Sequence, residues 1–259
     1  MHSLPVIRVT ARATDFCFRH AFPLYARCYD LYKMRSDRAV IRLVNSLVRP
    51  GDRVAAVGAN VGCYSRLLAR LVGATGLVYA FEPDRLNFAR LRGRVDAFPQ
   101  LHAVHAAVAD APGSRTLYRS PSLNVDHRTY ATDERRESVT VDAVSLDTFF
   151  AGTEDPLHFV KMDIQGGEYA ALRGMRSVVG RSPDLKILME LWPFVHDRYG
   201  EGTDALLGLL ASWGFEVRRL TADTASLGPP FVDADAIPDR ADPDTYFDVL
   251  CARAGTLAA

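Results

Sequence analysis

The 259-residue sequence predicts an α/β fold: a mostly parallel seven-stranded sheet with helices on both faces, preceded by an N-terminal helical extension. Two observations predict it. From Arg53 onward, short apolar runs alternate with longer segments of helical periodicity, which is typical of parallel strands that are covered on both faces. The first apolar run leads into a turn with two glycines, Gly58 and Gly62, which opens many ligand-binding α/β folds.

The elements are expected in alternating order after the turn at Pro50-Gly51-Asp52. Strands are expected at Arg53–Val57, Leu77–Phe81, Leu101–Ala107, Leu157–Met162, Leu185–Leu191, Phe215–Leu220 and Tyr246–Ala252. Helices are expected at Gly62–Val72, Pro83–Val95, Gly167–Val179 and Thr203–Trp213. Only an irregular segment connects the last two strands, so these two are expected to pair antiparallel.

The chain divides into an N-terminal helical extension or lid, residues 1–50, and a ligand-binding domain, residues 51–259. Aromatic residues recur at helical spacing between Thr14 and Val48. Nine basic residues stand against three acidic ones between Arg8 and Arg49, which indicates either a solvated helix face or a lid that attracts an anionic acceptor. Two long polar segments, Tyr118–Ser138 and Ala222–Asp244, are expected to overhang a ligand crevice.

Composition excludes several classes of protein. Lys plus Arg and Asp plus Glu both total 31, so no global charge favours nucleic acid. The four cysteines are scattered, which argues against a zinc site or a redox motif. No apolar run approaches the length that spans a bilayer, and the N-terminus is too polar for a signal peptide. The expectation is a cytoplasmic enzyme without a membrane anchor.

Three features of the sequence, one turn and two acidic residues, indicate a bound nucleoside. The turn at Gly58, Asn60 and Gly62 brings backbone and a helix N-terminus close to a ligand. Glu82 ends the second strand, where a carboxylate can accept hydrogen bonds from both ribose hydroxyls. Asp110 follows the third strand and could bond an adenine amine. The dinucleotide fingerprint G-x-G-x-x-G fails at Asn60 and Cys63, which argues against a nicotinamide-dependent oxidoreductase but leaves it as an alternative.

The chain resembles the FkbM-type methyltransferase family. The matching segments are VGANVGCYS (Val57–Ser65), LVYAFEPD (Leu77–Asp84), AAVAD ending at Asp110, SLDTFF (Ser145–Phe150), FVKMDIQGGEYAALRGM (Phe159–Met175) and ILME (Ile187–Glu190). The resemblance implies a class I methyltransferase (Rossmann-like) fold that uses S-adenosylmethionine. It also implies that Gly58, Asn60 and Gly62 hold the methionine part of that cofactor, Glu82 the ribose and Asp110 the adenine. The chain departs from the family pattern at Ala56, where an acid is usual, at Gln165, where Glu is usual, and at Gly167, where Ala is usual.

Carboxylates are expected where the fourth and fifth strands end. Asp163 and Glu190 follow these strands and should face the cofactor, and Glu168 lies in the first turn of the next helix. A hydroxyl acceptor needs a base or a metal to lower its pKa. Asp163, Glu190 and His196 are therefore the predicted catalytic residues, with His127 as another candidate base. Asp163 is also a predicted cofactor-binding residue. Asp163, Glu168 and Glu190 are a candidate Mg²⁺ site.

The function that the resemblance implies is S-adenosylmethionine-dependent O-methylation of a hydroxyl on a sugar or related natural product. A non-catalytic S-adenosylmethionine-binding module is a further alternative. The expected partner is a small-molecule acceptor rather than nucleic acid, and the sequence leaves a homo-oligomer open.

Overall fold

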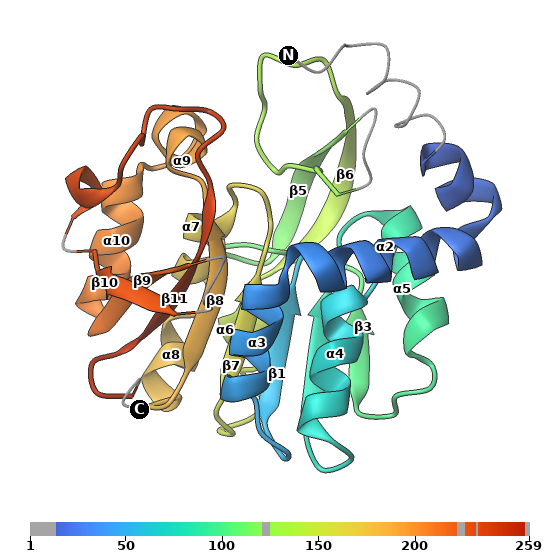
Figure 1. Cartoon of the computed structure of the whole chain (residues 1–259), viewed down its shortest axis with the longest axis horizontal. Helices are drawn as coiled ribbons and strands as arrows, with labels where there is room; N and C mark the ends of the chain where they lie inside the picture. The colour runs from blue at the N-terminus through green and yellow to red at the C-terminus, as the bar shows by residue number, and fades with distance from the viewer. Residues whose placement is uncertain (1–13, 121–124, 222–225, 232, 257–259) are drawn as a thin grey trace.

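The computed structural model describes residues 14–120, 125–221, 226–231 and 233–256 (Figure 1). Eight strands form the main sheet in the order β10-β9-β11-β8-β7-β1-β2-β3. In chain order they are β1 (Arg53–Val57), β2 (Leu77–Phe81), β3 (Leu101–Val104), β7 (Phe159–Met162), β8 (Lys186–Leu191), β9 (Phe215–Leu220), β10 (Leu227–Pro230) and β11 (Phe247–Arg253).

Strands β3, β2, β1, β7 and β8 are parallel, and β11 pairs antiparallel with both β8 and β9. This confirms the mostly parallel sheet and the antiparallel last two strands. The sheet has eight strands rather than seven because Leu227–Pro230, inside the expected loop Ala222–Asp244, adds β10 at the edge.

The two faces of β1 show why the sheet is covered on both sides. Val54 and Ala56 belong to one apolar cluster, whereas Ala55 and Val57 belong to the other. Because successive side chains of a strand point to opposite faces, a continuous apolar run must be buried on both. The helices that supply the first cluster are α3 (Arg38–Leu47), α4 (Cys63–Val72) and α5 (Arg85–Val95).

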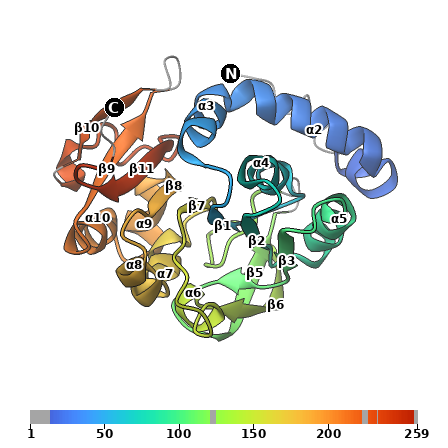
Figure 2. The ribbon, with the colours of Figure 1, turned by 90° about the horizontal axis from the view of Figure 1, so that it is seen from below.

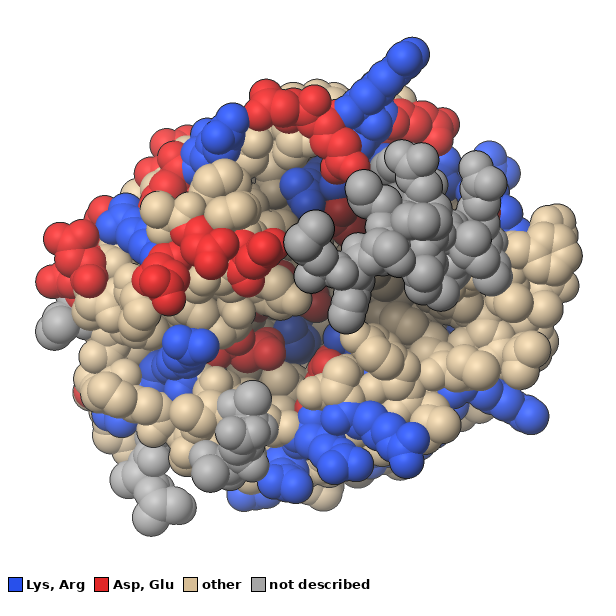
Figure 3. All heavy atoms as spheres, turned by 45° about the horizontal axis from the view of Figure 1, so that its top comes forward, with Lys and Arg blue, Asp and Glu red and all other residues tan. Residues whose placement is uncertain are grey.

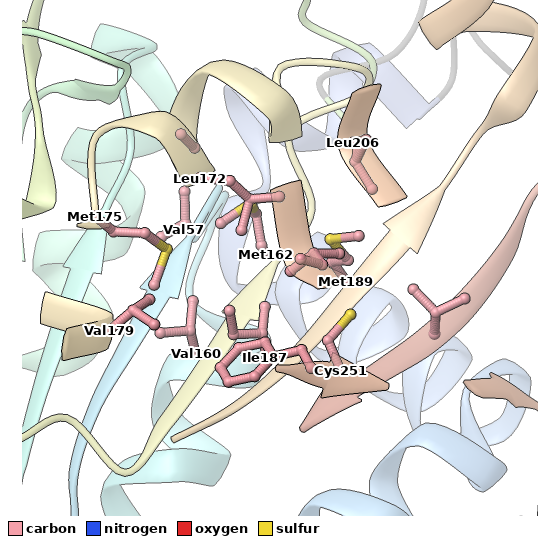
Figure 4. Packing of buried hydrophobic residues seen from close by; sticks show 14 of the residues in the cluster. Val57, Val160, Met162, Leu172, Met175, Val179, Ile187, Met189, Leu206 and Cys251 are labelled. Atoms are coloured by element: carbon pink, nitrogen blue, oxygen red, sulfur yellow. The ribbon is translucent and has the colours of Figure 1, made fainter. Parts of the chain in front are cut away.

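The opposite face is covered by α6 (Leu146–Phe149), α7 (Glu168–Arg173), α8 (Arg176–Arg181) and α10 (Thr203–Ser212) (Figure 2). Met162 and Met189 on neighbouring strands pack there with Leu172 and Leu206 (Figure 4). The expected helix Gly167–Val179 is two helices, α7 and α8. They are interrupted at Gly174, where a Cβ would collide with the backbone oxygen of Ala109.

A second sheet, in the order β4-β6-β5, rises beyond the main sheet (Figure 1). Its strands are β4 (Ala107–Val108), β5 (Gly113–Arg119) and β6 (Glu137–Val144). The expected strand Leu101–Ala107 is therefore wrong at its end, because the chain leaves the main sheet after Val104 and Ala107 already pairs with β6. β5 and β6 were not predicted, since most of their residues are exposed or half-buried and form no apolar run.

The N-terminal extension is helical at residues 14–20, in α2 (Phe22–Ser36) and in α3; residues 1–13, with Arg8 and Arg12, lie outside the described part. Ion pairs attach α2 to the domain: Asp30 contacts Arg94 of α5 and Arg66 of α4, the latter at 3.0 Å. Arg90 of α5 lies 4.5 Å from the centroid of the Phe22 ring and donates hydrogen bonds to two carbonyl oxygens, those of Phe18 and Arg19. These contacts fix α2 against α4 and α5.

None of the helices in the described ranges is both long enough and apolar enough to cross a membrane.

Candidate active site

The turn after β1 brings backbone from two strands into close contact. Gly58 has a φ of +80°, and a Cβ there would collide with the backbone oxygen of Asp163. Asn60 also has a positive φ, and Gly62 precedes the first residue of α4. Only glycine fits at position 58, so the sequence signal at this turn reflects the close packing of β1 against β7.

Glu82 lies beside this turn, at the end of β2. Glu82 is 5% exposed, and its carboxylate accepts hydrogen bonds from the backbone N–H groups of Asn60 and Asp84 at 2.8 and 2.9 Å. Burial raises the pKa of Glu82 to about 7 although these hydrogen bonds oppose the shift. Each carboxylate oxygen can accept a second hydrogen bond, so Glu82 can still bind the hydroxyls of a ribose.

A first cavity, about 680 Å³ including its open mouth, lies along these residues. Gly58, Asn60 and Glu82 line it on one side, and Asp163 and Gln165 line it on another. The apolar wall is made of Phe81, Ala106, Ala107, Val108, Leu117 and Ile164. This combination of an apolar wall and a buried carboxylate fits an adenosine group.

Asp110 does not line this cavity. It follows β4 in the second sheet, is 35% exposed on its side chain and pairs with Arg115 at 2.6 Å. That hydrogen bond from Arg115 lowers the pKa of Asp110. The structure therefore does not bring Asp110, the residue expected to bind adenine, to this cavity, because the chain turns away from the main sheet before reaching it and Ala106–Val108 form the wall instead.

Residues of the expected loop Tyr118–Ser138 cover the cavity, apart from 121–124, which lie outside the described part. Val125, His127 and Thr129 line it. His127 accepts a hydrogen bond from the backbone of Ser120 and lies 4.0 Å from Asp84, which caps α5. Burial lowers the pKa of His127. The described residues of Ala222–Asp244, by contrast, line none of the cavities at this site.

Asp163 and Glu190 are brought together at the ends of β7 and β8. The side-chain amide of Gln165 donates to both carboxylates, at 2.8 Å to Asp163 and 3.0 Å to Glu190. Burial and the charge of Asp163 raise the pKa of Glu190 to about 8. Burial and the neighbouring charge therefore favour the protonated form of Glu190.

Lys161 lies on the same side of the sheet. Its ammonium is 4.0 Å from Asp163 and 3.7 Å from Asp248, which is the register partner of Glu190. Burial alone lowers the pKa of Lys161, but the carboxylates of Asp163, Asp248 and Glu190 outweigh it and raise that pKa. The site therefore holds the positive charge of Lys161 next to the carboxylate of Asp163.

A second cavity, about 1310 Å³ including open space, adjoins the first. The two share Tyr29, Val125, Asp163 and Gln165. The second cavity adds charged side chains and aromatic rings, namely Lys33, Asp37, Asp126, Arg128, Lys161, Glu190 and Asp248 with Tyr32, Tyr64, Trp192 and Tyr246. Figure 3 shows red and blue side chains together in the hollow of this face.

His196 and Glu168 lie in the interior instead. Both side chains are 1% exposed, and Glu168 also accepts a hydrogen bond from the backbone of Ile164. Neither residue lines the cavities at this site, so the structure does not bring His196, which was expected to act on the acceptor, to them. His196 belongs to α9 (Pro193–Tyr199), a helix that the sequence analysis missed, and α9 turns it inward.

The Mg²⁺ site expected from Asp163, Glu168 and Glu190 is also corrected. The amide of Gln165 lies between Asp163 and Glu190, while Glu168 faces His196 and the backbone of Ile164. Within the described ranges, no three His, Cys, Asp or Glu side chains are arranged to hold a metal ion.

Several residues of the site were not identified from the sequence. Tyr29 and Lys33 come from α2, Trp192 and Tyr246 from the segments beside β8 and β11, and Arg128 from the loop. Trp192 lies 5.8 Å from Tyr246 between ring centroids, and the guanidinium of Arg128 is 5.2 Å from the Trp192 ring. The sequence signals were the helical spacing of Tyr25, Tyr29 and Tyr32, which is equally typical of a helix core, the basic run that includes Lys33, and the polar loop that includes Arg128.

Known proteins resemble this chain in sequence and in fold. The chain is 26% identical to the 31-O-demethyl-FK506 methyltransferase FkbM of Streptomyces tacrolimicus over 243 residues, covering 82% of this chain and 85% of that protein. The structure of a presumed rRNA methylase from Clostridium thermocellum matches with a TM-score of 0.50 and 12% identity, over 84% of this chain and 94% of that one. An rRNA methylase from Streptococcus thermophilus gives a TM-score of 0.46 at 10% identity, over 83% and 93%.

The fold is that of the class I S-adenosylmethionine-dependent methyltransferases. The family profile described as "Methyltransferase FkbM domain" matches residues 56–217, which is more than half of the chain and contains the glycine turn, Glu82, Asp163 and Glu190. The chain therefore belongs to the FkbM methyltransferase family.

Proposed function

We propose that the protein transfers a methyl group from S-adenosylmethionine to a hydroxyl oxygen of a polyhydroxylated small molecule, a sugar or a related natural product. The observation that carries this proposal is the junction of the two cavities at Asp163 and Gln165. One cavity fits a nucleoside, the other is polar and aromatic, and a carboxylate lies where they meet.

The first cavity has the features that the cofactor requires. Glu82 can bind the ribose, the apolar wall at Ala106–Val108 can hold the adenine, and the turn at Gly58 and Asn60 admits close approach of the remainder. When bound, S-adenosylmethionine supplies an electrophilic methyl group on its sulfonium.

The second cavity supports a hydroxylated acceptor. Aromatic rings such as those of Trp192 and Tyr246 can pack against the apolar faces of sugar-like rings, while carboxylates and amides bind their hydroxyls. The relative from Streptomyces tacrolimicus is named as an O-methyltransferase, which favours oxygen as the target.

The residues of the chain have distinct tasks in this proposal. Asp163 accepts the proton that the acceptor hydroxyl loses, and the ammonium of Lys161 stabilises negative charge near it. Gln165 keeps the carboxylates of Asp163 and Glu190 in place. The loop over the first cavity limits the access of water.

The test is calorimetric titration with S-adenosylhomocysteine, followed by a screen of sugars and glycosylated natural products for S-adenosylmethionine-dependent mass gain. We expect saturable binding that EDTA does not change, and an O-methylated product. A folded sample that binds no S-adenosylhomocysteine would contradict the methyltransferase assignment. Binding without turnover across a broad panel would favour the non-catalytic alternative.

A further inference from the structure

A third cavity, about 430 Å³ including open space, continues from the first beneath α2. The two cavities share Tyr29, Gly58, Asn60 and Asp163. The remaining lining residues of the third cavity are Lys33, Ala56, Val57, Ala59, Cys63, Tyr64 and Lys161. A ligand with its ribose at Glu82 and its sulfur near Asp163 therefore has its far end in this third cavity.

Two ammonium groups flank this space. The Nζ atoms of Lys33 and Lys161 lie 5.8 and 5.5 Å from the centroid of the same ring, that of Tyr64. Lys33 pairs with Asp37 at 2.6 Å, but Asp37 does not line the third cavity. Asp163 is the one carboxylate among its lining residues, so the positive charges outnumber the negative ones there.

Tyr29 also faces the third cavity. Its ring stacks on Tyr25 with 5.6 Å between centroids and 10° between planes, which fixes its direction. The structure gives its hydroxyl no hydrogen-bond partner among the described residues. The side chain is half-buried, and burial raises the pKa of Tyr29. A hydroxyl in this position is available to donate to a bound anion.

We propose that the third cavity binds the amino-acid end of the cofactor and that Lys33 and Tyr29, both from the N-terminal helix α2, bind its carboxylate. This inference rests on the proposed function, because it needs S-adenosylmethionine as the ligand. It makes the extension a part of the cofactor site, and the ion pairs of Asp30 hold it there.

The test compares two ligands that differ in that end. S-adenosylhomocysteine carries the amino acid, whereas 5′-methylthioadenosine has the same adenosine and sulfur without it. By calorimetry, we expect Lys33→Met to weaken S-adenosylhomocysteine about tenfold or more and to leave methylthioadenosine unchanged, since a charge-assisted hydrogen bond is lost. Tyr29→Phe should weaken the first ligand by a smaller factor, about threefold.

Matched controls lie on the same helix. Arg35→Met removes an exposed cation that lines none of the three cavities, and Tyr32→Phe alters a ring that lines only the second. Neither should change either affinity. Lys33→Arg should restore most of the binding, and thermal melts should show that each variant is folded.

The outcomes separate the two proposals. A wild-type protein that binds no S-adenosylhomocysteine contradicts the proposed function itself. If the wild type binds, equal affinity of Lys33→Met and wild type overturns only the inference. An equal loss of both ligands also overturns it, because Lys33 would then act on the shape of the whole site rather than on a carboxylate.

Discussion

The imidazole Nε2 of His196 lies 3.4 Å from Oε2 of Glu168, with both side chains 1% exposed. Burial raises the pKa of Glu168 to about 7 and lowers the pKa of His196 to about 4. Between these values both groups are neutral, which avoids a buried charge. The pair joins α7 to α9 beneath the site without reaching it.

Replacing Glu168 by Gln should change how stability depends on pH. A raised pKa means that the folded protein favours protonated Glu168. Its contribution to the stability of the fold is therefore complete below about pH 4.5 and is lost as the pH rises through about 7. The amide mimics the protonated acid, so Glu168→Gln should unfold at a higher temperature than the wild type at pH 8. We expect its free energy of unfolding to be larger by about 1–3 kcal/mol. Thermal unfolding between pH 5 and 8 measures this. Parallel curves for variant and wild type would contradict it, and exposed Glu154→Gln is the control.

Replacing Gln165 by Met should destabilise the protein more at high pH. The change removes the donor shared by Asp163 and Glu190. Because the pKa of Glu190 is raised to about 8, repulsion between the two carboxylates grows as the pH passes that value. We expect a loss of about 1–2 kcal/mol at pH 9 and less at pH 6, by urea unfolding. The control, Gln100→Met, removes a hydrogen bond between neutral groups, to the backbone oxygen of Ala69, so the stability that it loses should not vary with pH. A loss of stability at Gln165 that is equally independent of pH would refute the prediction.

Replacing Gly58 by Ala should cost both stability and cofactor binding. The added Cβ meets the backbone oxygen of Asp163 at a φ of +80°, so β1 and β7 must separate. We expect a loss of about 2–4 kcal/mol in the free energy of unfolding, and no measurable S-adenosylhomocysteine binding. Gly208 lies in α10 with no atom near an added Cβ, and Gly208→Ala should stabilise by roughly 0.5–1 kcal/mol. Unchanged stability at position 58 would show that the turn can relax.

Replacing Asp163 by Asn should abolish turnover and largely spare cofactor affinity. The amide keeps the shape but cannot accept the proton, so kcat should fall by about 10²-fold or more. The calorimetric Kd for S-adenosylhomocysteine should change by less than about threefold. Asp133→Asn, at an exposed ion pair with Arg198, is the control. A folded Asp163→Asn that loses the ligand would make Asp163 a cofactor-binding residue instead.

The sequence by itself determined the parallel core and the cofactor turn. Strands Arg53–Val57, Leu77–Phe81 and Phe215–Leu220 have the predicted bounds, because runs of apolar residues between turns have few other places to be buried. Gly58 and Glu82 were identified for a local reason: a glycine turn and an acid at a strand end lie close together whenever their strands are neighbours.

The tertiary structure alone decided which polar side chains meet. Asp110 was expected to bind adenine because it follows the third strand, and His196 was a candidate base, but the chain leaves the sheet before Asp110, and α9 turns His196 toward Glu168. Tyr29 and Lys33 line the same cavity as Asp163 because Asp30, Arg66 and Arg94 hold α2 against α4 and α5. Such contacts join residues far apart in the chain, and a helical pattern specifies which face of a helix is apolar but not what that face will meet.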